Sequence, residues 1–269
     1  MKEARNFVAL GTRVSGTAGA KRAANYIAAR LESTGIENRV DVFTNATPHG
    51  SVVFRNVIGT IAGQDARTVI IAGHYDTKGR ISERFVGAND SGSSTGLMLA
   101  LAEHLKSTTL PFTLAFAFFD GEECAVHYGP GDGLHGSRHL ANSLEPDDVH
   151  AVIVVDMIGD RDLNVTIPRN SSPFLVSAVF DAARVTGARK HFSLHTGTIL
   201  DDHVPFLDRG FAAIDLIDFE FGSEPGKNDY WHTNEDTMDK ISAESLEIVG
   251  RVVLQLLNAL PPVSSVPGS

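Results

Sequence analysis

The chain has a single cysteine, Cys124, among its 269 residues. One cysteine forms no disulfide within the chain and no cysteine-rich zinc site, so any bound metal must be held by His, Asp and Glu side chains. Positive charge is also scarce, because 23 Lys and Arg residues against 33 Asp and Glu residues give a formal net charge of −10. This acidic balance disfavours nucleic acid and anionic membrane surfaces as partners.

Long apolar runs and linkers are absent as well. No apolar stretch approaches transmembrane length, so we expect no membrane span. The start, Met1–Asn6, lacks the apolar core of a signal peptide. Localisation is therefore open: the chain as written would stay in the cytoplasm, and export to the periplasm is plausible if a signal segment was removed. With 42% hydrophobic residues and no Pro/Gly/Ser-rich linker, the composition predicts one catalytic domain over residues 1–269, with a frayed tail over 261–269. We expect a monomer, although the sequence does not determine the oligomeric state.

Segments with the periodicity of strands alternate along the chain with segments that have the periodicity of helices. Helices are predicted over 16–31, 91–105, 136–141, 173–184 and 243–260, and strands over 39–43, 52–61, 68–72, 112–119, 151–155 and 211–217. Ser137 is a candidate N-cap for the third of these helices. Such alternation predicts an α/β fold, a three-layer α/β/α sandwich with a mixed, mostly parallel twisted central sheet. We expect the first two strands to form an edge pair.

The most informative segment is 118–123, Phe-Phe-Asp-Gly-Glu-Glu, in which an apolar strand ends in three carboxylates and a glycine. A buried strand cannot carry unpaired acids without a large desolvation cost. The acids are therefore expected beyond its carboxyl end, in the crevice where open α/β sheets bind ligands. Neighbouring acids can divide the work there, since one can hold a cation while another moves a proton.

Other predicted strands also end in side chains that can bind a metal. His74 and Asp76 follow one of them, and Asp156 follows another. Because the carboxyl ends of parallel strands meet at one edge of the sheet, we expect these side chains to gather with Glu122 and Glu123. Carboxylates meeting without matching Lys or Arg repel one another unless a cation lies among them. A set of nitrogen and oxygen donors without thiolate suits zinc or a similar divalent ion.

Taken alone, each polar residue has a plainer explanation. Asp90 fits a helix cap, and Trp231 fits the hydrophobic core. Cys124 fits a small buried residue. His203 fits a partner of Asp201 and a purely structural role equally well. Three histidines have no partner motif and are expected on the surface: His150, His191 and His195.

Five motifs, in their order and spacing, resemble the zinc-dependent aminopeptidases of the M28 type. They are His74-Tyr75-Asp76, Gly87-Ala88-Asn89-Asp90-Ser91-Gly92, Asp120-Gly121-Glu122-Glu123, Val155-Asp156-Met157-Ile158-Gly159 and Trp231-His232-Thr233. Two further blocks are similar to the glutaminyl-peptide cyclotransferases of this group: residues 136–141, which follow His127-Tyr128, and residues 201–207. The resemblance covers most of the chain from His74 onward and implies a zinc-aminopeptidase-like fold.

Carried over by motif position, this resemblance implies a zinc site. Asp90, Glu123 and His232 would hold one ion. His74 and Asp156 are the remaining ligands of the two-metal aminopeptidases. One zinc is expected for a cyclase, and two for an aminopeptidase.

The same resemblance implies roles around the metal. Glu122 would transfer protons, and Asp201 and Asp156 would complete the catalytic set. Three residues are expected in the substrate pocket: Trp231, Tyr128 and Asp215. The chain departs from the animal cyclases at two of these positions, because Asp215 replaces a histidine and Tyr128 replaces a tryptophan. Its segment 218–230 is also longer than the animal counterpart and carries several acids.

Two reactions fit these residues. In a cyclase, the N-terminal amine of a glutaminyl peptide or protein attacks its own side-chain amide, so pyroglutamate forms and ammonia leaves. In an aminopeptidase, water attacks the first peptide bond instead, and Glu122 acts as its general base. The two cyclotransferase-like blocks favour the cyclase, and the sequence leaves the aminopeptidase open.

Overall fold

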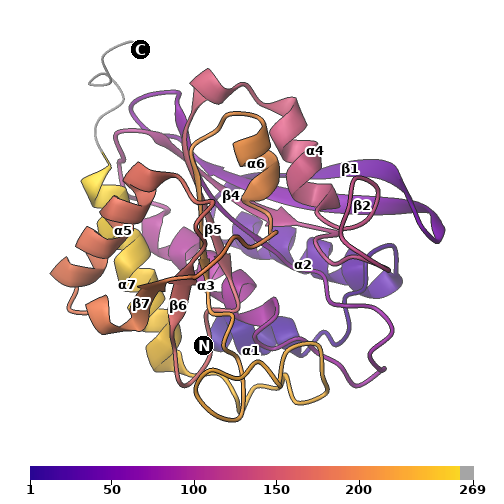
Figure 1. Ribbon diagram of the computed structural model, residues 1–269. Coiled ribbons are helices and arrows are strands. Elements are labelled where there is room, and N and C mark those ends of the chain that lie inside the picture. Colours follow the sequence, from indigo (N-terminus) through magenta and orange to yellow (C-terminus); the bar gives the residue numbers. More distant parts are fainter. Residues whose placement is uncertain (261–269) are drawn as a thin grey trace.

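A mixed sheet of eight strands runs through the part of the chain that the structure, a computed structural model, describes, residues 1–260 (Figure 1). The strands are β1 (Glu37–Thr47), β2 (Gly50–Ile61), β3 (Thr68–His74), β4 (Thr113–Phe119), β5 (Val149–Asp156), β6 (Val165–Ile167), β7 (Phe192–Leu194) and β8 (Ala213–Ile217). Their order across the sheet is β1-β2-β4-β3-β5-β8-β6-β7. Strands β4, β3, β5 and β8 are parallel neighbours, and the antiparallel hairpin β1–β2 forms one edge. The predicted mixed sheet and its edge pair are confirmed.

Helices cover both faces of this sheet. They are α1 (Lys2–Val8), α2 (Ala18–Ser33), α3 (Gly92–Leu105), α4 (His135–Ser143), α5 (Pro173–Val185), α6 (Val204–Asp208) and α7 (Ala243–Ala259), with short 3-10 turns at Pro146–Asp148 and Arg189–His191. Side chains of α1, α2, α3, α5 and α7 share one core cluster with the strands. Those of α4 and α6 share a second cluster with the opposite face. The result is the predicted three-layer α/β/α arrangement (Figure 1).

The strands are continuously apolar because both faces of the sheet are covered. Neighbouring residues on a strand point to opposite faces. Thus Ile71 and Phe118 belong to the larger cluster, while Ile70 and Phe119 belong to the smaller one. Each such side chain contributes about 1.5–3 kcal/mol when it is fully buried. This two-sided burial fixes the central strands rigidly, so the residues that follow them are held in place.

The structure corrects one predicted helix start. Helix α4 begins at His135, and its N-cap is Leu134, with a φ of 53°. Ser137 therefore lies inside the first turn, and the prediction that it caps the helix was wrong. The helix starts early because the backbone N–H groups of Leu134 and His135 donate to the carbonyl oxygens of Glu122 and Gly121. This tether also fixes α4 to the acidic segment after β4.

Other predicted elements lie within a few residues of the observed ones, and several short elements were missed. Strands β6 and β7 have three residues each, too few to show a periodicity. Among residues 1–260, no helix combines the length and the apolar character that a membrane span requires. The predicted frayed tail, 261–269, lies outside the described residues. A single domain over 1–269 and a monomeric state stay predictions.

Candidate active site

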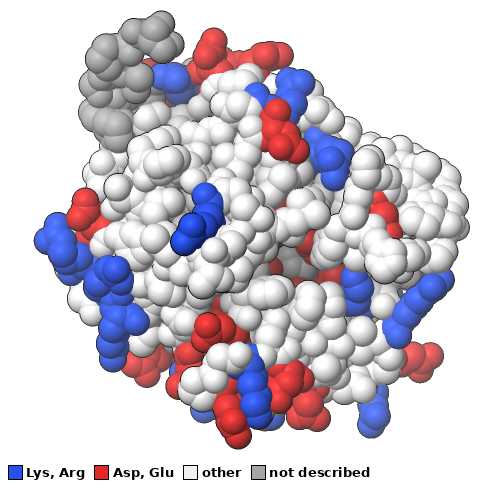
Figure 2. All heavy atoms as spheres, in the orientation of Figure 1, with Lys and Arg blue, Asp and Glu red and all other residues white. Residues whose placement is uncertain are grey.

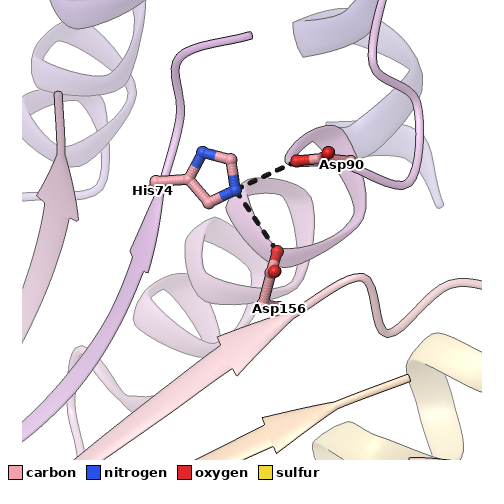
Figure 3. A group of neighbouring side chains, drawn as sticks. All are labelled: His74, Asp90 and Asp156. Atoms are coloured by element: carbon pink, nitrogen blue, oxygen red, sulfur yellow. Dashed lines mark ion pairs between the residues drawn. The ribbon is translucent and has the colours of Figure 1, made fainter. Parts of the chain in front are cut away.

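The carboxyl ends of β3 and β5 bring His74 and Asp156 together with Asp90. His74 is the last residue of β3, Asp156 is the last of β5, and Asp90 lies in the loop before α3. The Nε2 atom of His74 lies 3.1 Å from Oδ1 of Asp90 and 3.3 Å from Oδ1 of Asp156 (Figure 3). All three side chains are buried. Residues far apart in sequence thus converge at one edge of the sheet, as the sequence predicted.

A second cluster shares Asp90 with the first. The Nε2 atom of His232 lies 3.3 Å from Oδ2 of Asp90 and 3.1 Å from Oε1 of Glu123. Asp90 therefore serves both imidazoles, each with a different oxygen. The alternative reading of Asp90 as a helix cap was wrong, because the N-cap of α3 is Ser91. The loop and strand ends have placed a bridging carboxylate between two histidines.

Both clusters fit a divalent metal ion. In each of them, one donor atom per residue lies within 4.8 Å of the other donors. Zinc binds nitrogen and oxygen at about 2.0–2.2 Å in tetrahedral geometry, which spaces its ligand atoms about 3.3–3.6 Å apart. The observed nitrogen–oxygen separations of 3.1 to 3.3 Å are close to that spacing. A donor set of nitrogen and oxygen without sulfur suits zinc.

Electrostatics point the same way. Burial lowers the pKa of His232, but hydrogen bonds to Asp90 and Glu123 outweigh it and raise the value to about 9. His74 likewise has a pKa well above its ordinary value, because its carboxylate neighbours outweigh burial. Burial raises the pKa of Glu123 and of Asp156, whereas the two histidines hold that of Asp90 below its usual range. The site attracts positive charge, whether protons or a metal ion.

Asp76 orients this arrangement from behind. Its Oδ1 lies 3.4 Å from Nδ1 of His74, the ring nitrogen that faces away from Asp90. Its two oxygens also accept the backbone N–H groups of Glu122 and Glu123. The sequence suggested that Asp76 could bind the metal, but the structure places it behind His74, beside the ring nitrogen that faces away from Asp90. Partners of this kind typically tune metal affinity.

Two buried residues that the sequence did not single out hold the loop that carries Asp90. Asp236 accepts the backbone N–H groups of Asn89 at 2.7 Å and Asp90 at 3.1 Å. The guanidinium of Arg13 donates to backbone carbonyl oxygens, including that of Gly87. Neither residue belongs to a recognisable motif, so no local signal could have revealed them.

Gly121 lets the chain turn sharply after β4. Its φ is +80°, and a Cβ at this position would lie 2.4 Å from the ring of Phe54. The turn separates the three acids of this segment. Asp120 does not contact the two histidines. It accepts hydrogen bonds from the hydroxyl of Ser15 and from the backbone N–H of Arg55. Only the two glutamates after the glycine reach the site.

A cavity of about 280 Å³ opens beside the clusters. Predicted site residues line it, namely Glu122, Tyr128, Asp156, Asp201 and Trp231. His195 also lines it, although the sequence placed this residue on the surface. Figure 2 shows that this view of the molecule has a hollow near its middle with acidic side chains inside.

Aromatic side chains shape this cavity. The hydroxyl of Tyr128 donates to Oε2 of Glu122 at 3.2 Å. The ring of Trp231 stacks on that of His232, with centroids 3.9 Å apart, and meets Phe219 edge-on. Tyr128 therefore restrains the proposed proton carrier, and Trp231 forms a wall over a proposed metal ligand.

Asp215 differs from its prediction. It lies in β8, fully buried, and is not among the residues that line the cavity. It neighbours His203 and Asp201 instead. Burial raises the pKa of Asp201 to about 7 and that of Asp215 well above its ordinary value, and it lowers the pKa of His203 to about 4.

Two further predictions for single residues have opposite outcomes. His150 is buried, with 8% of its surface exposed, so its prediction as a surface residue was wrong. His150 belongs to β5, which begins two residues before the predicted strand 151–155, and its ring lies near that of Phe112. Cys124 is buried, as predicted, and its Sγ lies 3.1 Å from Nζ of Lys78.

Comparisons with known proteins agree with this geometry. Residues 56–257 match the model of "Peptidase family M28". The chain is 31% identical over 281 residues to the glutaminyl-peptide cyclotransferase-like protein of Bos taurus, covering 92% of the chain and 72% of that relative. Its structure superposes on the crystal structure of Acidobacteriales bacterium glutaminyl cyclase with a TM-score of 0.90. The two sequences are 34% identical, and the match covers 96% of this chain and 92% of the other. A Zn-dependent exopeptidase from Parabacteroides distasonis superposes with a TM-score of 0.84 at 27% identity, over 96% of each chain.

Proposed function

The chain belongs to peptidase family M28 and, within it, to the glutaminyl-peptide cyclotransferases, and on this basis we propose that it converts the N-terminal glutamine of peptides or proteins to pyroglutamate with release of ammonia. One observation carries the proposal. Asp90, Glu123 and His232 converge beside Glu122, at a cavity of about 280 Å³. In this proposal, the pocket admits the substrate's N-terminus beside the metal ligands and the proton carrier.

The reaction needs little beyond positioning and proton transfer. The substrate's α-amine attacks the carbon of its own side-chain amide, so the two reacting groups are already joined. A carbon–nitrogen bond forms, the bond to the amide nitrogen breaks, and ammonia leaves. Zinc held by Asp90, Glu123 and His232 would polarise the amide oxygen.

Glu122 is the proposed proton carrier. It lines the cavity, and burial raises the pKa of its carboxyl well above the ordinary value. A group with such a pKa can take a proton from the attacking amine and return it to the departing nitrogen. The hydrogen bond from Tyr128 holds Oε2 of Glu122 and leaves Oε1 for the substrate. One carboxylate can thus serve both proton steps.

The other cavity residues would orient the substrate. Asp201 lines the cavity and can accept an N–H of the reacting amide. Asp156, at the end of the neighbouring strand β5, contacts His74 and completes the acidic wall. The ring of Trp231 restricts the space for water, which would otherwise hydrolyse the amide rather than allow cyclisation.

Aminopeptidase activity is the competing function. It is favoured by the cluster of His74, Asp90 and Asp156, which fits a second ion next to the first. Two ions held by these residues would supply the activation of water, with Glu122 as the general base. The number of bound ions is part of the proposal, and we propose one for the cyclase reaction.

A product assay tests the function. The zinc-loaded protein is incubated separately with a glutamine-initiated dipeptide and with leucine amide, and metal-stripped protein is the control. We expect ammonia from the dipeptide with its peptide bond intact, and no free leucine from the amide. Release of leucine, or cleavage of the dipeptide into amino acids, would establish the aminopeptidase instead. Equal rates with and without zinc would remove the proposed role of the metal.

A further inference from the structure

A third group of donors lies behind the cavity and shares no residue with the two Asp90 clusters. It consists of Asp201, His203 and Asp215, which offer donor atoms within 4.8 Å of one another. Their exposed fractions are 3%, 0% and 0%. Asp201 and His203 precede α6, whereas Asp215 lies within β8, so the fold rather than a local turn brings them together.

Most side-chain polar atoms of this group have no hydrogen-bond partner within residues 1–260, although Oδ1 of Asp201 accepts the backbone N–H of Asp202. Both oxygens of Asp215, Oδ2 of Asp201 and both ring nitrogens of His203 lack a hydrogen bond. The nearest approach of His203 to Asp215, from Nδ1 to Oδ2, is 3.8 Å, which is beyond hydrogen-bonding distance. Two buried carboxylates beside an imidazole, with so few donors, are stabilised by a proton or a cation among them. No Lys or Arg of the described chain forms an ion pair with any of the three.

We propose that Asp201, His203 and Asp215 bind a divalent cation of the zinc type, at a site separate from the Asp90 clusters. Two carboxylates and one imidazole form a donor set that zinc uses in proteins. Burial keeps the ring of His203 neutral, with a pKa lowered to about 4, so a nitrogen lone pair is free for a metal. The group meets the same spacing condition as the two clusters at the metal site.

The site is reachable from the cavity and compatible with the proposed role of Asp201. Asp201 lines the cavity, so a cation can enter from that side. A carboxylate has about four lone-pair positions on its two oxygens, so Asp201 can meet a cation on one side and a substrate N–H on the other. The cation would fix the orientation of Asp201. The rival explanation is a proton shared between Asp201 and Asp215.

Zinc counts distinguish the two explanations. The protein is stripped with a chelator and dialysed against zinc chloride, and zinc per chain is measured by elemental mass spectrometry. We expect D215N and H203A each to hold one zinc fewer than the wild type. The matched control is D202N, because Asp202 is equally buried and both its oxygens lack partners, yet it lies outside the group. D202N should keep the wild-type count.

This experiment compares the zinc content of each variant with that of the wild type. The result therefore does not depend on how many ions the Asp90 clusters hold, or on which reaction the protein performs. Unchanged zinc in both D215N and H203A would overturn the cation and leave the shared proton. Loss of zinc in D202N as well would overturn it too, because the effect would then be general.

A thermal measurement guards against misfolded variants. In the E123A background, which removes a ligand of the first site, added zinc chloride should still raise the unfolding temperature. The double variant E123A/D215N should lose that response while its circular dichroism spectrum stays native-like. An equal zinc response in the single and double variants would contradict the proposed site.

Discussion

Two buried groups of carboxylates and imidazoles meet at the same cavity, and they are built in opposite ways. Around Asp90, the Nε2 atom of each histidine lies 3.1 to 3.3 Å from two carboxylate oxygens. Around Asp215, His203 comes no closer than 3.8 Å and makes no hydrogen bond. The first group balances much of its charge internally, whereas the second has no internal donor.

The two histidines show what this difference does. His232 has a pKa raised to about 9, because contacts with two carboxylates outweigh burial. His203 has a pKa lowered to about 4, because burial acts on it alone. The pKa of the same residue type thus shifts in opposite directions in two loops around one cavity. Contact at hydrogen-bonding distance, more than the number of nearby acids, decides the sign.

We expect the largest loss of zinc affinity when Glu123, a proposed metal ligand next to Asp90, is removed. E123A deletes a carboxylate that contacts His232, and we expect zinc affinity at this site to fall about 100-fold or more, with loss of turnover. Titration against a chromophoric chelator measures the affinity. E83A, which alters an exposed glutamate, is the matched control. Undiminished zinc affinity in E123A would show that Glu123 is not a ligand.

Glu122 tests whether the two neighbouring acids have separate roles. E122Q keeps the size of the side chain and its acceptor for Tyr128, so zinc should remain bound. Turnover of a glutamine-initiated dipeptide should fall by about 100-fold or more, because the amide cannot carry the proton. Near-normal turnover in E122Q would exclude this role.

Lys78 tests whether a neighbour of Glu123 influences zinc affinity at the Asp90 clusters. Its Nζ lies 3.3 Å from Oε2 of Glu123, the oxygen that faces away from His232. K78M should lower zinc affinity about 10-fold, because Glu123 loses the partner that orients it. K78R should recover part of the affinity, since it keeps the charge. Equal affinity in the wild type, K78M and K78R would mean that Lys78 plays no positioning role.

Asp218 is a buried acid at the same edge of the sheet, but unlike Asp215 it has hydrogen-bond donors. We expect the smallest effect for its substitution. It accepts the backbone N–H groups of Asn164 and Glu220, and burial raises its pKa to about 7. Between about pH 4 and 7, the folded state therefore binds a proton that the unfolded state lacks. The stability that Asp218 contributes is present at the low end of this window and is lost as the pH rises through it, by at most about 1.4 kcal/mol per pH unit.

D218N should remove this dependence. Urea unfolding at several pH values across the window measures it, and the free energy of unfolding of the wild type should fall relative to that of D218N as the pH rises. Parallel curves for the two proteins would show that the carboxyl of Asp218 titrates normally.

The sequence by itself determined the fold class and the residue types of the site. Continuous apolar runs such as 68–72 and 112–119 predicted buried strands, because a strand covered on both faces must be apolar throughout. Polar residues directly after those strands, such as His74 and Glu122, predicted where the site lies. These inferences succeed because periodicity and strand ends are local properties of the chain.

Tertiary structure decided which atoms meet. Only the folded chain shows that Asp90 contacts two histidines and that Asp76 lies behind His74. It also shows that Asp236 holds the loop that carries Asp90, although the two residues are 146 positions apart. The folded structure also shows that Asp215, which the sequence predicted in the substrate pocket, does not line the cavity. Such contacts depend on the path of the whole chain and on the depth at which each side chain is buried. No short segment of sequence contains that information.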